Sequence, residues 1–176
     1  MPRPNLLDYR SLNVISNHQF EAIINSIPGA EGTEKNLSIK CKGFEMPGLE
    51  VSRLEVIIQG FKFYNSAGST VFPGQFTITY LEDSAYSVHK IMRAWKESAA
   101  GTISGTTAGD KNAYSRDIIL RQYNPQGEAV GELTMIGCFP FTLPATPLES
   151  TQSPTPTELQ ITFSFDMSTL AGVINR

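Results

Sequence analysis

Few residues in this chain have a type and spacing suited to chemistry. Its 176 residues include two histidines, His18 and His89, so any mechanism that needs an imidazole must use one of them. His18 opens a predicted strand and His89 lies beside the apolar stripe of a predicted helix. Neither has the neighbouring groups typical of a catalytic triad or a metal site. We therefore expect no catalytic residue, no metal site and no cofactor, and we predict that the protein is not an enzyme.

One glycine-rich segment faintly resembles a phosphate-binding loop. Gly101, Gly105 and Gly109 are followed by Lys111, but Asp110 separates the last glycine from the lysine. No Ser or Thr follows the lysine, and the loop leaves a helix instead of joining a strand to one. A surface loop, or a loop that touches a neighbouring subunit, is the better interpretation.

The other polar and reactive groups also fit structural roles. Glu82 and Asp83 precede a predicted helix, where the helix dipole stabilises negative charge. Cys41 and Cys138 are far apart and lack a CxxC pair, which favours reduced, buried thiols over a disulfide or a zinc site. Trp95 is better interpreted as a core residue than as a ligand platform.

Composition limits the classes of partner. Charged residues make up 18% of the chain, below the roughly 25% typical of soluble domains. A net charge of -3 argues against a surface that recognises nucleic acid specifically. No apolar run approaches the roughly 20 residues of a membrane-spanning helix, and the N-terminal prolines and charges do not fit a signal peptide. We expect one domain that folds in a cytoplasm without membrane insertion.

Hydrophobic periodicity predicts a mainly β, antiparallel fold. Apolar and polar residues alternate over 18–25, 37–44 and 158–167, which predicts three strands. The segment 114–139 is predicted to form one long β-hairpin. Its turn is Asn124-Pro125-Gln126-Gly127, where proline and glycine favour a tight turn.

A second long hairpin is predicted over 48–83, with its turn at Asn65 to Gly68. Val56, Ile57 and Ile58 are three consecutive apolar residues. Because neighbouring residues of a strand point to opposite faces, both faces of this hairpin carry apolar side chains that need to be buried. We do not expect one subunit alone to bury both faces.

A single helix is predicted over about 84–99, because apolar residues recur there at spacings of three and four. The proline-rich segment 144–157 is predicted to be an extended loop. These elements predict three parts: an N-terminal arm (1–17), a β domain (18–167) and a C-terminal arm (168–176).

The order of these segments carries a resemblance. It rests on HQFEAIIN, on LSIKCKGFEMPGLEV with its Met46-Pro47-Gly48 bend, on FTITYLEDSAYSVHKIMRAWKESAAG, on SRDIILRQYNPQGEAVGELTMIGCFP and on LQITFSFD. In this order, over about 18–166, the chain resembles the tail tube proteins of contractile-tailed bacteriophages. That family is related to the inner tubes of contractile injection systems and of type VI secretion.

The resemblance implies a fold and an assembly. Each subunit would be an antiparallel β-sandwich or half-barrel with long hairpins and one flanking helix. Six subunits would form a ring in which their strands complete a β-barrel. Stacked rings would form a tube inside a contractile sheath, as the conduit for DNA ejection into the host. The protein would then be part of the virion, assembled in the host cytoplasm.

Two sets of residues receive roles from this resemblance. The hairpin that reaches the adjacent ring is expected to use Arg53, Glu55, Ile57, Phe61, Phe63, Asn65 and Gly68. Polar alternate positions suit a wet lumen that repels DNA. The expected lumen residues are Gln19, Glu21, Thr77, Glu132, Thr134, Thr162 and Asp166.

The implied partners are other copies of the chain, a tail sheath protein, baseplate and tail terminator proteins, and the tape-measure protein and genomic DNA in the lumen. Three alternatives stay open at this point. The chain could form a baseplate ring on which the tube starts, or the inner tube of a secretion or injection system. A small ligand-binding or hydrolytic β-sandwich is the third, and the missing nucleophile–base arrangement counts against it.

Overall fold

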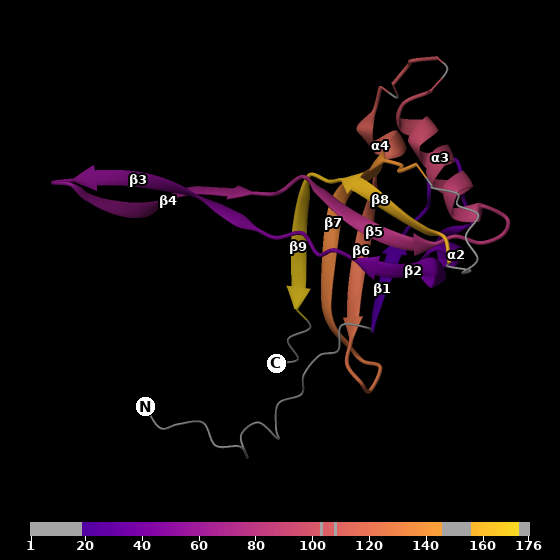
Figure 1. The fold of residues 1–176 in the computed structure, drawn as a ribbon, viewed down its shortest axis with the longest axis horizontal. Coiled ribbons are helices and arrows are strands. Elements are labelled where there is room, and N and C mark those ends of the chain that lie inside the picture. Colours follow the sequence, from indigo (N-terminus) through magenta and orange to yellow (C-terminus); the bar gives the residue numbers. More distant parts are fainter. Residues whose placement is uncertain (1–18, 103, 108, 146–155, 173–176) are drawn as a thin grey trace, which may run out of the picture.

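The structure is a computed structural model that describes residues 19–102, 104–107, 109–145 and 156–172. The expected N-terminal arm (1–17), His18 and most of the proline-rich loop (146–155) lie outside the described residues. Figure 1 shows a body of crossed β-sheets with helices on one side and one long hairpin that projects away from it.

Two antiparallel sheets form the body. The first has the order β1-β6-β7-β9 and the second the order β2-β5-β8-β7, so β7 belongs to both. The strands of the first sheet are β1 (Phe20–Ile24), β6 (Arg116–Tyr123), β7 (Ala129–Thr142) and β9 (Met167–Gly172). Those that complete the second are β2 (Cys41–Phe44), β5 (Gln75–Leu81) and β8 (Glu158–Ser164). The mainly β, antiparallel fold class is confirmed, and the strands described for this single chain do not close into a barrel.

β7 changes sheets at Gly137. β7 pairs with β9 up to Ile136 and with β6 up to Cys138, and from Phe139 onward it pairs with β8. Gly137 has a φ of 73°, and its N–H donates to Asp117 Oδ1 at 3.1 Å. A β-carbon at this position would collide with the carboxylate of Asp166. Only glycine fits this bend without strain.

The core lies between the two sheets and under helix α3 (Ser87–Ala99). Trp95 is fully buried against Phe163, and its indole N–H donates to the carbonyl of Tyr114 at 2.6 Å. The predictions of this helix, of its apolar stripe and of a core role for Trp95 are confirmed. The helix begins three residues later than predicted, because Tyr86 takes a left-handed conformation with a φ of 53°.

The segment predicted as a strand over 37–44 is wrong in its first half. Residues 34–40 form helix α2 (Glu34–Lys40), and only 41–44 form a strand, β2. Leu37 is buried, but Ile39 is 76% exposed, so the two do not share an apolar face. The Glu34 carboxylate accepts from the backbone amides of Ile27 and Gly32, each at 3.2 Å, which ties the start of α2 to the loop before it. Leu37 and Cys41, four residues apart, fit either a helical or a strand period.

A further short helix, α4 (Lys111–Tyr114), follows the glycine-rich segment. Asp110 caps it, because its side chain accepts from the backbone N–H of Asn112 at 3.0 Å. Lys111 pairs with the carboxylate of Asp166. Asp110 and Lys111 therefore both have partners within the subunit.

The C-terminal segment differs from its prediction. β8 ends at Ser164, and Met167 opens β9 instead of ending the preceding strand. β9 pairs with β7 from Ile136↔Met167 to Gly131↔Gly172. Residues 168–172, assigned above to a C-terminal arm, are therefore part of the first sheet, and 173–176 lie outside the described residues.

The hairpin predicted over 114–139 is confirmed as β6 and β7. In its turn the N–H of Gly127 donates to the carbonyl of Asn124 at 2.9 Å. The second hairpin consists of β3 (Glu50–Ile58) and β4 (Phe61–Val71), which pair with each other and with no other strand that the structure describes.

The turn predicted at Asn65 to Gly68 is wrong, because the chain reverses at Gln59-Gly60. Both residues have positive φ, 51° and 82°, as in the two-residue type I′ turns that join strands tightly. Asn65 instead pairs with Leu54 within the ladder, and Gly68, with a φ of 75°, lies in a bulge opposite Ser52.

Candidate functional site

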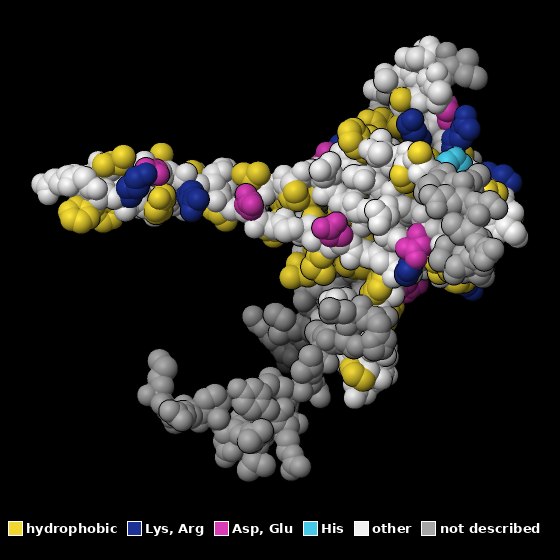
Figure 2. Space-filling view, viewed as in Figure 1, with side chains coloured by type: hydrophobic (Ala, Val, Ile, Leu, Met, Phe, Trp, Pro, Cys, Tyr) yellow, Lys and Arg dark blue, Asp and Glu magenta, His cyan; other side chains and the backbone are white. Residues whose placement is uncertain are grey.

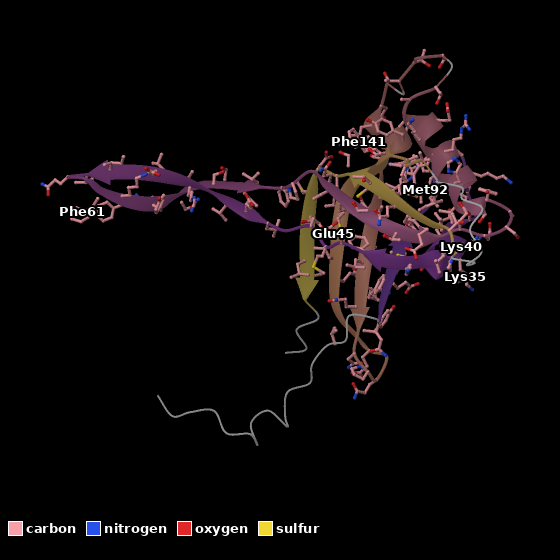
Figure 3. All side chains as sticks on the ribbon, in the orientation of Figure 1. Lys35, Lys40, Glu45, Phe61, Met92 and Phe141 are labelled. Atoms are coloured by element: carbon pink, nitrogen blue, oxygen red, sulfur yellow. The ribbon has the colours of Figure 1, made fainter. Side chains whose placement is uncertain are left out.

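The β3–β4 hairpin exposes an unusual amount of apolar surface. All eleven residues of β4 are exposed. Figure 2 shows hydrophobic side chains along both sides of the hairpin, and Figure 3 places Phe61 near its tip, far from the body. Half of the exposed large hydrophobic side chains among the described residues belong to this hairpin: Val51, Leu54, Ile57, Ile58, Phe61, Phe63, Tyr64 and Val71.

The pairing register separates the hairpin into two faces. Residues directly opposite each other share a face, and Ile58↔Phe61, Val56↔Phe63 and Leu54↔Asn65 are such pairs. We call the face made by Leu54, Val56, Ile58, Phe61 and Phe63 the apolar face.

The other face is mixed. Lys62 Nζ lies 2.8 Å from Glu55 Oε1, and the Arg53 guanidinium stacks over the Tyr64 ring at 5.2 Å. Ile57 lies among these groups. This face can be solvated, whereas the apolar face has no partner within the described part of the subunit.

The residues expected to stack rings divide between these faces. Arg53, Glu55 and Ile57 lie on the mixed face. Phe61, Phe63 and Asn65 lie on the other face, and Gly68 is at the bulge. Leu54 and Ile58 share the face of the two phenylalanines but are not among the residues expected to stack rings, because the turn predicted at Asn65 to Gly68 implies a different register.

A second candidate surface is the face of the first sheet that points away from the core. Glu21, Arg121 and Glu132 lie opposite one another across β1, β6 and β7. Arg121 donates through Nε and Nη2 to Glu132 Oε2 at 3.1 and 2.8 Å, and the carboxylate raises the pKa of Arg121. Tyr123 Oη donates to Glu21 Oε2 at 2.9 Å. We call this surface the polar sheet face.

The structure places the expected lumen residues in three regions. Glu21, Glu132 and Thr134 share the polar sheet face, and Gln19 immediately precedes β1. Thr77 and Thr162 are a cross-strand pair on the second sheet, where they line a groove of about 390 Å³ with Met46 and Phe141.

Asp166, the remaining expected lumen residue, lies between β8 and β9 in its ion pair with Lys111. The polar sheet face is also less acidic than the sequence analysis implies. Arg121 pairs with Glu132 there and offsets part of its negative charge.

The third feature is a pair of free edges on the first sheet. β1 and β9 are its outermost strands, and among the described residues each pairs with one neighbouring strand. Unpaired strand edges present backbone N–H and C=O groups that readily accept another strand. Figure 1 places β1 and β9 on opposite sides of β6 and β7.

The described residues contain no group of three or more His, Cys, Asp or Glu side chains placed to hold a metal. Cys41 and Cys138 are free thiols, and burial raises the pKa of each to about 12, so both stay protonated at neutral pH. Within the described part of the chain, no helix is long and apolar enough to span a membrane.

Comparisons with solved structures show the fold. A chain of the sheath/tube terminator of an extracellular contractile injection system (PVC) in its extended state has a TM-score of 0.65 at 14% identity, over 92% of this chain and 99% of that one. A chain of the PVC sheath–tube complex has 0.62 at 14%, over 97% and 99%. A chain of the anti-feeding prophage baseplate has 0.64 at 12%, over 93% and 99%.

The sequence itself matches a family. None of the curated proteins gives a significant match. Residues 11–169, however, match the family described as phage tail tube protein, so the match includes the projecting hairpin, the first half of β9 and all other strands of both sheets. The chain belongs to the phage tail tube protein family, whose members are structural proteins and not enzymes.

Proposed function

We propose that this protein is the repeating subunit of a tail tube. Six copies form a ring, and rings stack inside a contractile sheath to enclose a lumen through which DNA is ejected into the host. Two features of the described part of the subunit carry this proposal: a four-stranded sheet whose two outer strands each have one neighbour there, and a long hairpin whose apolar face has no partner there.

The sheet edges support ring formation. A contact between β9 of one copy and β1 of the next is head-to-tail, and repeating it gives a closed ring or an open filament. Closure removes every free edge of the first sheet and produces a barrel whose wall continues from subunit to subunit. The four strands β1, β6, β7 and β9 are then the contribution of each subunit to the wall.

The polar sheet face is the surface that we propose for the lumen. The opposite face of the same sheet packs on the core, so the polar sheet face points away from the subunit body. The lumen residues of this proposal are Gln19, Glu21, Glu132 and Thr134. Thr77 and Thr162 belong to the second sheet and are not part of this wall.

The β3–β4 hairpin is the element that we propose to connect stacked rings. Burying one side chain of Leu, Ile or Phe contributes about 1.5–3 kcal/mol, so the five residues of the apolar face offer on the order of 10 kcal/mol before the cost of association. Exposed in a free subunit, such a surface would promote non-specific aggregation.

The further partners follow from the same proposal. The similar structures include a sheath–tube complex, a sheath/tube terminator and a baseplate, which favours sheath, baseplate and terminator proteins as neighbours. The tape-measure protein and genomic DNA are the proposed lumen contents. The protein is then part of the virion, assembled in the host cytoplasm.

A second candidate has specific support. The similar structures reported above come from an extracellular contractile injection system and from the anti-feeding prophage, and one of them is a baseplate. The same subunit architecture would serve as the inner tube of an injection system or as a baseplate ring on which the tube starts. The contents of purified particles, nucleic acid or protein, distinguish a phage tube from an injection tube.

The test is the assembly state of the full chain. Purified protein examined by light scattering and negative-stain microscopy should show rings or tubes. In a variant with Ser52–Ser69 replaced by Asn-Gly, a tight turn joins the cross-strand partners Val51 and Thr70. This variant should form rings that do not stack. A wild-type protein that stays a compact monomer at high concentration would overturn the proposal.

A further inference from the structure

We infer that the base of the β3–β4 hairpin of one copy binds the exposed face of α3 on the next copy in the ring, through opposite charges. We call Glu45 and Glu50 the acidic base, and we call Lys90, Arg93 and Lys96 the basic helix face. The inference rests on the proposed ring and identifies a second contact between the neighbours that β9 and β1 join.

The basic helix face carries cations without carboxylate partners. Lys90, Arg93 and Lys96 recur at a spacing of three, which places them on one side of α3, and all three are exposed. Among the described residues none of them forms an ion pair, although Lys90 Nζ donates to a backbone carbonyl. Glu97, the one acidic residue of α3, accepts from the backbone N–H and the hydroxyl of Thr102. Figure 2 shows Lys and Arg side chains over the α3 side of the body.

The acidic base carries the opposite charge on the other side of the body. Glu45 and Glu50 flank the Met46-Pro47-Gly48 bend, and both are exposed. Within the described part of the chain neither forms an ion pair. Figure 3 places Glu45 on the side from which the hairpin projects and Met92 of α3 on the other side. A subunit therefore cannot join its own acidic base to its own basic helix face.

The acidic base is fixed near the start of β9. Glu50 opens β3 opposite Val71, the last residue of β4. The chain continues to Gly74, whose carbonyl accepts from the backbone N–H of Phe165 at 3.0 Å. Phe165 lies two residues before Met167, the first residue of β9. The hairpin therefore leaves the body at the end of the first sheet where β9 begins.

The basic helix face is fixed near one end of β1. The loop that follows Ile24, the last residue of β1, packs on α3, because a β-carbon at Gly29 would lie 3.3 Å from the carbonyl oxygen of Ala94. Ala94 is the neighbour of Arg93 in the helix. The basic helix face therefore lies close to the end of β1 that finishes with Ile24.

Strand direction brings these two ends together in a ring. β1, β6, β7 and β9 alternate in direction, because each pairs antiparallel with the next. When a rotation about one axis relates the copies, β9 of one copy is also antiparallel to β1 of the next. One row of cross-strand pairs runs from Ile24 in β1 to Ser168 in β9, so the last residue of β1 and the start of β9 lie at the same end of the sheet. Continuing the sheet then puts the acidic base of one copy beside α3 of the next, where opposite charges favour this neighbour.

The first experiment compares Glu50→Lys with Glu128→Lys in the full chain. Glu128 is exposed in the turn between β6 and β7, at the opposite end of the sheet, and its substitution changes the net charge equally. At low salt Glu50→Lys should raise the subunit concentration needed for half-assembly into rings by about tenfold, as measured by sedimentation velocity. Glu128→Lys should raise it by less than about threefold. Equal effects of the two variants would overturn the inference.

Salt provides the second arm of this experiment. The difference between the two variants should shrink at about 1 M salt, where the Debye length is about 3 Å. A difference of the same size at low and high salt would contradict an ionic contact.

A mixing experiment tests which two surfaces meet. The variants Glu45→Lys/Glu50→Lys and Lys90→Glu/Arg93→Glu each place like charges at every contact of a ring, so neither should form rings alone at concentrations where the wild type does. An equimolar mixture should form rings, because alternating the two variants restores opposite charges at each contact. Circular dichroism of each variant checks that it is folded. Folded variants that assemble alone, or that stay unassembled when mixed, would overturn the inference.

The outcomes separate this inference from the proposed function. If the wild type forms rings and both charge-reversed variants form them equally well, the inference is wrong and the tube subunit stands. A wild type that never forms rings would overturn both.

Discussion

The two long hairpins of this protein are both rich in apolar residues but have opposite surroundings. The β6–β7 hairpin buries Ile118, Leu120, Leu133 and Met135 in the core. The β3–β4 hairpin carries equally apolar residues and pairs with no other strand of the described chain. In both segments the alternating residues and the turn residues favour a hairpin. These local patterns do not show which residues pack against its apolar side chains. The difference supports our proposal that another molecule buries the apolar face of β3–β4.

The largest expected effect comes from a matched pair of isoleucines. Ile118→Ala removes a fully buried side chain from β6 and should lower the free energy of unfolding by about 2–5 kcal/mol. Ile58→Ala makes the same chemical change where the side chain is 55% exposed and should cost less than about 0.5 kcal/mol.

Urea denaturation at concentrations too low for assembly measures both variants. Comparable losses of stability would contradict the assignment of β3–β4 to an intermolecular role, because they would show that the subunit itself covers Ile58.

The next effect concerns assembly alone. Phe61→Ser combined with Phe63→Ser removes the two largest side chains of the apolar face and should leave the melting temperature of the dilute subunit unchanged. Stacking into tubes should fall at least a hundredfold in apparent affinity, as electron microscopy and sedimentation report. Glu55→Gln on the mixed face is the control. Tubes of normal length from the double variant would remove the stacking role.

The two turns offer a comparison of smaller effects. Gly60 and Gly127 have nearly the same φ, 82° and 83°, and a β-carbon at either would meet nothing within 4 Å. Alanine at either position should therefore cost about 1–2 kcal/mol of backbone strain. Gly127→Ala should lower the melting temperature of the subunit.

Gly60→Ala should instead weaken the tip of the projecting hairpin, and its effect should appear in tube stacking with the subunit melting temperature preserved. Thermal unfolding and sedimentation of the same two samples provide the check. A lower melting temperature for Gly60→Ala would show that β3–β4 folds cooperatively with the body.

The smallest effects are expected for ion pairs. Glu132→Gln in the body and Glu55→Gln in the hairpin each break a pair with a partly exposed cation, so each should change subunit stability by about 0–1 kcal/mol. Denaturant titrations at low and high salt measure both. If Glu132→Gln lowered the free energy of unfolding by several kcal/mol, the ionic groups of the polar sheet face would be holding the subunit together rather than lining a solvent-filled lumen.

Much of the fold could be predicted from local patterns. The alternation of apolar and polar residues predicted β1 and β8, and the helical period predicted α3. The prediction failed where one short pattern fits two periods, as in α2, where Leu37 and Cys41 suit either. It also failed at Gln59-Gly60, because apolar residues on both sides made the chain look continuous, while Asn65 to Gly68 had the composition of a turn.

The candidate site was harder to predict, because it depends on how distant strands pair. Glu21, Glu132 and Thr134 share one face only because β6 lies between β1 and β7. Thr77 and Thr162 have the same alternating pattern but belong to the other sheet. Leu170 appeared to be part of an arm, and its place at a sheet edge follows from pairing with β7.

A cryo-electron microscopy map of the assembled wild-type protein at side-chain resolution tests the central claim most directly. The account predicts a continuous β wall in which β9 of each subunit lies beside β1 of the next. In the same map the apolar face of β3–β4 should be buried against a subunit of another ring. A particle in which that face contacts solvent, or in which β1 and β9 remain unpaired, would contradict the account.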